Sequence, residues 1–411
     1  MAQTIFIIII SILVFDYIVE RILDYLNSTY WSNKLPEELQ EIYDAEKYKK
    51  SQDYQKVNQR FSLLTSTLSF VAMMLMLLLG GFAFVDNFVR QYTVNPLVMA
   101  LLFFGIIGFV SDILSTPFSI YDTFVIEQKF GFNNTTVKTF ILDKLKGWLL
   151  AIILGSIFIA LFILIYNKTG INFWWIAWLV FSAISIFFSM FYSNLIVPLF
   201  NKQTPLEEGE LRTAIEVFSN KVGFKLNNIF VIDGSKRSNK ANAYFTGLGS
   251  KKRIVLYDTL IKDHTTEELV AVLAHEVGHY KKKHTLKGII ISLLETGMML
   301  YILSWFISNP VLSEAFGTKQ SFHIAIIVFG ILYSPLSMIL GLAMNVLSRK
   351  HEYEADKFAG ENYNAESLKS ALKKLSVNNL SNLKPHPAYV FFHYSHPTLL
   401  QRLAALNQLN K

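Results

Sequence analysis

The stretch "AVLAHEVGHYKKKH" (271–284) decides the fold, because it joins a metal-binding pattern to a membrane segment. His275, Glu276 and His279 have the spacing His-Glu-X-X-His, and on a helix the two histidines lie one turn apart on the same face. The apolar run 287–307 begins only a few residues later and is long enough to cross a bilayer. The candidate metal site is therefore close to a membrane span along the chain.

The composition of the whole chain is that of a membrane protein. Of its 411 residues, 52% are hydrophobic and 17% are charged, whereas about a quarter of the residues in an average soluble protein are charged. The chain contains no cysteine, which excludes a disulfide, a thiolate metal site and a cysteine nucleophile. A bound metal must therefore use His, Asp or Glu side chains.

Seven apolar segments are candidate membrane spans. They lie near 3–19, 62–85, 97–114, 147–166, 173–199, 287–307 and 322–347. All lysine and arginine residues except Arg90, Lys168 and Lys319 fall in one set of connections, namely 20–61, 115–146, 200–287 and the residues after 347. This bias follows the positive-inside rule, with the N-terminus outside and the C-terminus in the cytosol. It also accounts for the net charge of +7 without a nucleic-acid partner.

The segment between the fifth and sixth spans has the composition and residue pattern of a globular domain. A helix is predicted over 208–224, and three strands are predicted in "NNIFVIDG", "NAYFTGL" and "KRIVLYDTLI". The helix with the metal-binding pattern follows, with Thr265 and Glu268 at capping-box spacing. Further helices are predicted near 365–377 and in "PTLLQRLAALNQL". The polar segment 33–60 is predicted to form an exposed helical hairpin.

The pattern itself predicts a catalytic zinc site. His275 and His279 can bind one Zn²⁺, which places Glu276 beside the open coordination position. There Glu276 can deprotonate the bound water and later protonate the leaving amine.

A third protein ligand is expected at a catalytic zinc, and the candidates lie in "SRKHEYEADKFAG" (348–360). On a helix, Glu352 and Asp356 share a face with two alanines, and these small residues allow a close approach. Glu352 is the predicted ligand, and Asp356 is predicted to orient one zinc histidine. Glu354 lies on another face and is predicted to be an ordinary solvated acid.

The ligands flank a membrane hairpin, and this fixes where the metal lies. The segment between His279 and Glu352 consists mostly of spans six and seven with a short external turn. The gaps between the ligands and the spans correspond to about 8–12 Å of helix. The metal is therefore expected at the cytosolic membrane surface or just inside the bundle.

With these residues in view, the chain closely resembles the type I CAAX prenyl proteases, which are integral-membrane gluzincins. The resemblance covers nearly the whole chain and is carried by "YDTFVIEQKFGFN" (121–133), "SKRSNKANAYFTGLGSKKRIVLYDTL" (235–260), "LAHEVGHYKKKH", "SRKHEYEAD" (348–356) and "YSHPTLLQRL" (394–403). It implies one zinc ion per chain on His275, His279 and Glu352, with Glu276 as the base. It also implies roles for four further residues.

In such enzymes the "NAY" strand holds the substrate backbone by strand addition, which implies substrate binding by Asn242 and Ala243. His396 resembles the family's oxyanion-stabilising histidine. Arg402 resembles a residue that organises the site as a partner of the acidic helix, through Asp356. The remaining histidines receive no role.

The expected fold is a multi-pass α-helical membrane protein, in which seven transmembrane helices enclose a chamber and a gluzincin-like α+β metalloprotease domain lies in the cytosol. The parts are expected at 1–199 (five spans, with cytosolic loops 20–61 and 115–146), 200–286 (first part of the metalloprotease domain, with the small sheet and the His-Glu-X-X-His helix), 287–347 (transmembrane hairpin) and 348–411 (second part of the metalloprotease domain).

The expected activity is the zinc-dependent release of the C-terminal AAX tripeptide from prenylated CAAX proteins. One alternative is a heat-shock-type quality-control metalloprotease of a bacterial membrane, and another is a transporter or scaffold whose structural zinc has four protein ligands. The expected partners are a peptide or prenylated CAAX substrate and the lipid bilayer, whereas the oligomeric state is open. The short external turn between spans six and seven favours a bacterial inner membrane, with the site facing the cytosol, over the endoplasmic reticulum of a eukaryote.

Overall fold

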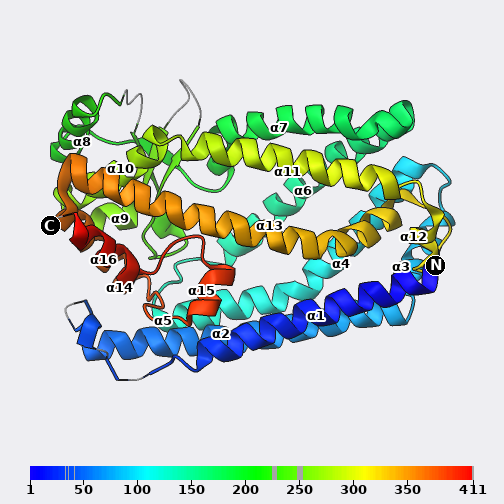
Figure 1. The fold of residues 1–411 in the computed structure, drawn as a ribbon, viewed down its shortest axis with the longest axis horizontal. Helices are drawn as coiled ribbons and strands as arrows, with labels where there is room; N and C mark the ends of the chain where they lie inside the picture. The colour runs from blue at the N-terminus through cyan, green and yellow to red at the C-terminus, as the bar shows by residue number, and fades with distance from the viewer. Residues whose placement is uncertain (33, 36, 41, 225–228, 248–252, 410–411) are drawn as a thin grey trace.

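The computed structural model describes every residue except 33, 36, 41, 225–228, 248–252 and 410–411. Within this described part, seven helices are long and apolar enough to cross a membrane, which confirms the predicted number of spans. They are α1 (Ala2–Ser28), α2 (Ala45–Leu78), α4 (Pro96–Tyr121), α6 (Val137–Thr169), α7 (Phe173–Leu195), α11 (His284–Phe306) and α13 (Phe322–Ala359). These helices run along the long axis of the molecule (Figure 1).

The two ends of the bundle differ. The N-terminus lies at one end together with two short helices, α3 (Gly81–Arg90) and α12 (Pro310–Glu314) (Figure 1). Close to this end, α1, α4, α7, α11 and α13 share one apolar core that includes Ile9, Phe103 and Phe173. In the most apolar stretch of each span, only 6% to 22% of the residues are buried. Most of these side chains therefore face lipid or an open interior.

The opposite end carries the soluble part of the chain (Figure 1). Its helices are α5 (Gln128–Phe130), α8 (Glu210–Lys221), α9 (Asp258–Asp263), α10 (Thr266–Lys281), α14 (Ala365–Asn378), α15 (Pro387–His393) and α16 (Leu399–Gln408). One apolar core combines residues that precede the α11–α13 hairpin, such as Leu273, with residues that follow it, such as Leu368 and Leu406. The two segments separated by the hairpin therefore fold together.

A four-stranded sheet lies in this part, with the strand order β1-β2-β4-β3. Its strands are β1 (Gln203–Pro205), β2 (Ile229–Ile232), β3 (Ala243–Thr246) and β4 (Arg253–Tyr257). The three predicted strands correspond to β2, β3 and β4. The strand β1 was not predicted, because it has only three residues, one of them a proline, and so shows no alternation of apolar and polar side chains. β3 pairs with β4 on one side and forms an edge of the sheet among the described residues.

The helix with the metal-binding pattern, α10, lies at the centre of the soluble core. The predicted capping box is confirmed, because Glu268 N donates to Thr265 Oγ1 at 3.3 Å and Thr265 N donates to Glu268 Oε2 at 2.9 Å. Val270, Leu273 and Val277 are fully buried against the surrounding elements. This packing fixes the rotation of the helix and therefore the face that carries the histidines.

Both candidate ligand helices lead directly into the membrane. α10 ends at Lys281, and Lys283 then adopts a left-handed conformation with φ of 59°, which turns the chain into α11. At the other side of the hairpin, α13 is one continuous helix from Phe322 to Ala359, so Glu352 lies on the helix that forms span seven.

The polar segment before span two differs from its prediction as an exposed helical hairpin. From Ala45 onward it is part of α2, and its Tyr48 is only 2% exposed. Tyr48 packs with Leu383 and Leu403 from the C-terminal segment, and Ser51 Oγ donates to Leu380 O at 3.2 Å. The tyrosines between the charged residues give this helix an apolar face, which the C-terminal segment covers.

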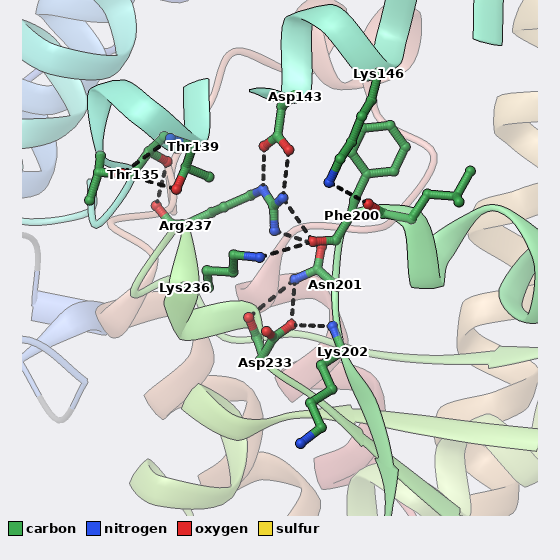
Figure 2. A network of polar contacts seen from close by, with 12 residues as sticks. Thr135, Thr139, Asp143, Lys146, Phe200, Asn201, Lys202, Asp233, Lys236 and Arg237 are labelled. Atoms are coloured by element: carbon green, nitrogen blue, oxygen red, sulfur yellow. Dashed lines mark hydrogen bonds and ion pairs between the residues drawn. The ribbon is translucent and has the colours of Figure 1, made fainter. Parts of the chain in front are cut away.

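A polar network fixes the sheet to the bundle (Figure 2). Arg237, from the connection that follows β2, donates to Asp143 on α6 through Nε (2.8 Å) and Nη2 (2.9 Å). The same guanidinium donates to Phe200 O at 2.9 Å and to Asn201 Oδ1 at 3.0 Å, just after α7. Asn201 Nδ2 in turn donates to Asp233 Oδ1 at 2.9 Å. One arginine thus links the sheet to two spans.

Candidate active site

The three predicted metal ligands lie together. One ligand atom from each of His275, His279 and Glu352 falls within 4.8 Å of the other two. The Nε2 atoms of the two histidines are 3.1 Å apart. Glu352 Oε1 lies 3.2 Å from His279 Nε2, and Oε2 lies 3.4 Å from His275 Nε2.

This group fits a divalent metal ion. Glu352 is 4% exposed, and its buried Oε2 has no hydrogen-bond partner. The nearest cation is Arg402, whose Nη1 lies 3.5 Å from this oxygen and makes no hydrogen bond to it. A buried carboxylate oxygen without a hydrogen bond is costly, and a metal ion in direct contact would remove that cost. Two imidazole nitrogens and one carboxylate form a donor set that suits zinc. Within the described residues the group has three members, as at catalytic sites, where one coordination position stays open.

A glycine allows the two ligand helices to approach. A Cβ on Gly278 of α10 would lie 3.1 Å from both the Cα and the carbonyl oxygen of Ala355 on α13. Ala355 and Ala359 are fully buried at this contact, as expected for the face with small residues. The close contact brings Glu352 to the histidines.

The outer nitrogen of His275 is held by an ion pair. His275 Nδ1 lies 2.9 Å from Asp356 Oδ1. Arg402 on α16 donates to both oxygens of Asp356, from Nη2 at 2.6 Å and from Nε at 2.8 Å. A carboxylate in this position accepts the Nδ1 proton and leaves Nε2 free for a metal.

Glu276 lies beside the ligand group and is partly exposed. Burial raises the pKa of its carboxyl, against the opposing effects of His275 and His279. The carboxylate is therefore easier to protonate than an ordinary glutamate, which suits a group that takes up a proton.

His396 also reaches the ligand group, from the loop between α15 and α16. Its Nε2 lies 3.3 Å from Glu352 Oε1, and its side chain is 61% exposed. Ser395 Oγ lies 2.9 Å from the other ring nitrogen. The ring therefore has one face open to a ligand.

Ala243 is the first residue of the neighbouring edge strand and Asn242 directly precedes it, and neither residue is in the ligand group. Asn242 is exposed, and its Oδ1 accepts a hydrogen bond from Ala243 N at 2.8 Å. Its carbonyl oxygen accepts from Tyr257 N at 3.1 Å, which continues the pairing of β3 with β4. β3 also contacts α10, so the strand edge is next to the helix with the histidines.

Two further residues at the site were not predicted. His284 Nδ1 lies 3.0 Å from His279 Nδ1, and His284 Nε2 lies 2.9 Å from Glu354 Oε2. The prediction of Glu354 as an ordinary solvated acid is therefore wrong. Its partner is in the first turn of α11, which the left-handed Lys283 turns back toward α13. A histidine shortly after the pattern was the only signal in the sequence.

Two family models match the chain and together cover almost all of it. The model described as CAAX prenyl protease N-terminal, five membrane helices, matches residues 26–202. The model of peptidase family M48 matches residues 205–410. The resemblance inferred from the sequence is therefore confirmed.

Relatives from eukaryotes are similar over most of their length. The chain is 35% identical over 405 residues to CAAX prenyl protease 1 of Saccharomyces cerevisiae, which covers 92% of this chain and 89% of the relative. It is 37% identical over 409 residues to a CAAX prenyl protease 1 homolog of Dictyostelium discoideum, with 97% and 95% covered. The crystal structure of S. mikatae Ste24p matches with a TM-score of 0.93 and 35% identity, over 98% of this chain and 99% of that chain. The chain therefore belongs to peptidase family M48, as a multi-pass membrane metalloendopeptidase of the CAAX prenyl protease type.

Proposed function

We propose that this protein is a zinc endopeptidase that releases the C-terminal AAX tripeptide from prenylated CAAX proteins. The proposal is carried by the group of His275, His279 and Glu352 on two helices that continue into membrane spans. In this proposal 200–286 and 348–411 form the metalloprotease domain, and 287–347 is the hairpin between its two parts. The relatives named CAAX prenyl protease 1 support the substrate class.

A zinc ion on these ligands would supply a Lewis acid that polarises the scissile carbonyl and increases the acidity of a water in the open position. Glu276 takes up the proton of the attacking water on its carboxylate. It then donates this proton to the nitrogen of the leaving amine. The partly exposed position of Glu276 beside His275 and His279 supports this role.

His396 stabilises the negative charge that develops on the carbonyl oxygen. Its exposed ring lies next to Glu352, so one N–H can donate to an oxygen held at the ligand group. A donor that is already in place at such an oxygen lowers the barrier without reorganisation.

The edge of β3 binds the substrate backbone. An extended peptide can add to this edge as a further strand, through Ala243 and its neighbours, and Asn242 can hold the peptide where the strand begins. Strand addition uses main-chain hydrogen bonds and therefore accepts varied side chains.

The position of the site suits a substrate anchored in lipid. A prenyl group stays in the bilayer because burial of each CH₂ contributes about 0.8 kcal/mol, and a site at the end of the spans can reach the peptide attached to it. We place the protein in the endoplasmic reticulum membrane, because the reported relatives are eukaryotic. The expected bacterial inner membrane has no support from these relatives.

The alternatives are less consistent with these observations. A structural zinc site is usually closed by four protein ligands, whereas this group has three members among the described residues. A heat-shock-type protease would not require the five-helix N-terminal family that matches residues 26–202.

The test is cleavage of one farnesylated CAAX peptide by the purified full chain in lipid nanodiscs, with the unprenylated peptide for comparison. Glu276→Gln should abolish cleavage while zinc stays bound, and Glu267→Gln is the matched control because it is exposed on the same helix. Cleavage should stop with a chelator and return with added zinc. Retained cleavage by Glu276→Gln would contradict its role as the base.

A further inference from the structure

The outer nitrogens of the two ligand histidines have different partners. His275 Nδ1 faces Asp356 directly at 2.9 Å. His279 Nδ1 faces another imidazole nitrogen, Nδ1 of His284, at 3.0 Å. Beyond it, His284 Nε2 lies 2.9 Å from Glu354 Oε2. The second ligand histidine is thus connected to a carboxylate through an intervening ring.

When a metal is bound, one assignment of donors and acceptors satisfies all of these contacts. His279 Nε2 faces Glu352 and His275, so this nitrogen is the ligand and must be unprotonated. The proton of His279 is then on Nδ1, and it donates to Nδ1 of His284. His284 must carry its own proton on Nε2, which donates to the Glu354 carboxylate. The acceptor at Glu354 therefore selects the tautomer of both histidines.

The connecting ring is held in place by packing. His284 is 5% exposed, and its ring stacks on His351 with a centroid distance of 3.9 Å and an interplanar angle of 12°. The backbone just before it is fixed by the left-handed turn at Lys283. Glu354 and His351 both come from α13, so the start of α11 is joined to the helix that carries Glu352.

We propose that His284 and Glu354 are positioning residues that hold His279 in the tautomer and orientation required to bind zinc. The inference rests on the proposed zinc site and adds two residues that lie outside the ligand group. Loss of such an outer partner typically lowers metal affinity about 10- to 100-fold. The substitution Glu354→Gln retains an oxygen acceptor for His284 and should preserve most of the zinc affinity.

The test measures the zinc dissociation constant of the full chain in nanodiscs by competition with a chelator. Glu354→Ala and His284→Phe should raise this constant about 10- to 100-fold, and Glu354→Gln should restore it to near the parent value. Glu361→Ala is the matched control, because Glu361 is an exposed glutamate that lies just after the end of α13. Loading with Co²⁺ should show altered visible absorption bands for Glu354→Ala and the parent bands for Glu354→Gln, which a purely structural role would not produce.

The outcomes separate this inference from the proposed function. A parent chain that binds no zinc would overturn the zinc site and this inference together. Zinc bound equally well by the parent and by Glu354→Ala would overturn this inference alone. Glu354→Gln as weak as Glu354→Ala would also overturn it, because the acceptor would then not be what matters.

Discussion

Gly278→Ala is the most direct test of the close contact that assembles the ligand group. The new Cβ would lie 3.1 Å from backbone atoms of Ala355 and 3.1 Å from Phe358 Cβ, whereas ordinary contacts begin at 3.4 Å. The helices α10 and α13 must therefore move apart by a few tenths of an ångström. Zinc requires metal–ligand distances within about 0.2 Å of their usual values. Zinc binding would therefore draw α10 and α13 together again and restore the steric strain between the added Cβ and Ala355.

The size of the effect follows from the steric strain alone. Overpacking of a close-packed contact costs about 1–3 kcal/mol, whereas the helix propensity of alanine is the same with and without zinc and changes only the folding stability. If the zinc-free chain relieves the strain fully, the loss is up to about 3 kcal/mol, which corresponds to roughly 100-fold in zinc affinity. A smaller loss is expected if part of the strain persists without zinc.

The assay compares zinc affinity and peptide cleavage between Gly278→Ala and Gly288→Ala. Gly288 is also helical, but its added Cβ meets nothing within 4 Å, so this control should bind zinc as the parent does. The reasoning is refuted if Gly278→Ala binds zinc and cleaves peptide as well as Gly288→Ala does.

Four further substitutions test three other sets of contacts. His396→Ala should lower kcat about 10²- to 10³-fold and leave zinc content unchanged; an unchanged kcat in a peptide assay would remove His396 from oxyanion stabilisation. Arg402→Met leaves the buried Asp356 without its cation and should cost about 3–5 kcal/mol of stability, seen as a lower unfolding temperature in detergent; an unchanged temperature would mean that Asp356 finds another partner. Arg237→Met and Asp143→Asn, combined in a double-mutant cycle, should show a coupling energy of about 1.5–3 kcal/mol; additive effects would mean that this contact does not stabilise the junction of sheet and bundle.

Local patterns in the sequence predicted the elements that depend on local spacing. Span length, the charge bias of the loops and the spacing of His275 and His279 are properties of short segments, and the capping box at Thr265 is as well. Glu352 could be chosen because the small residues Ala355 and Ala359 mark a contact face on the same helix. Each of these inferences needs only the geometry of one helix.

The contacts that were missed depend on how separate segments meet. The pair of His284 and Glu354 requires the left-handed Lys283, and such a conformation is rare for lysine and leaves no signal in the sequence. The burial of Tyr48 depends on the C-terminal segment more than three hundred residues away. The contact between Arg237 and Asp143 likewise joins segments that no local pattern relates.

The partners of the four carboxylates at the site account for their different roles. Asp356 is neutralised by Arg402, and Glu354 accepts from His284. Glu352 faces the two ligand histidines; its Oε2 makes no hydrogen bond and lies 3.5 Å from Arg402 Nη1. Glu276 makes no hydrogen bond or ion pair with any residue that the structure describes. A carboxylate held by a cation or a donor resists protonation, whereas burial without a partner favours it. These surroundings support the proposal that Glu276 takes up and returns the proton, with Glu352 as a ligand and Asp356 and Glu354 as partners of the ligand histidines' outer nitrogens.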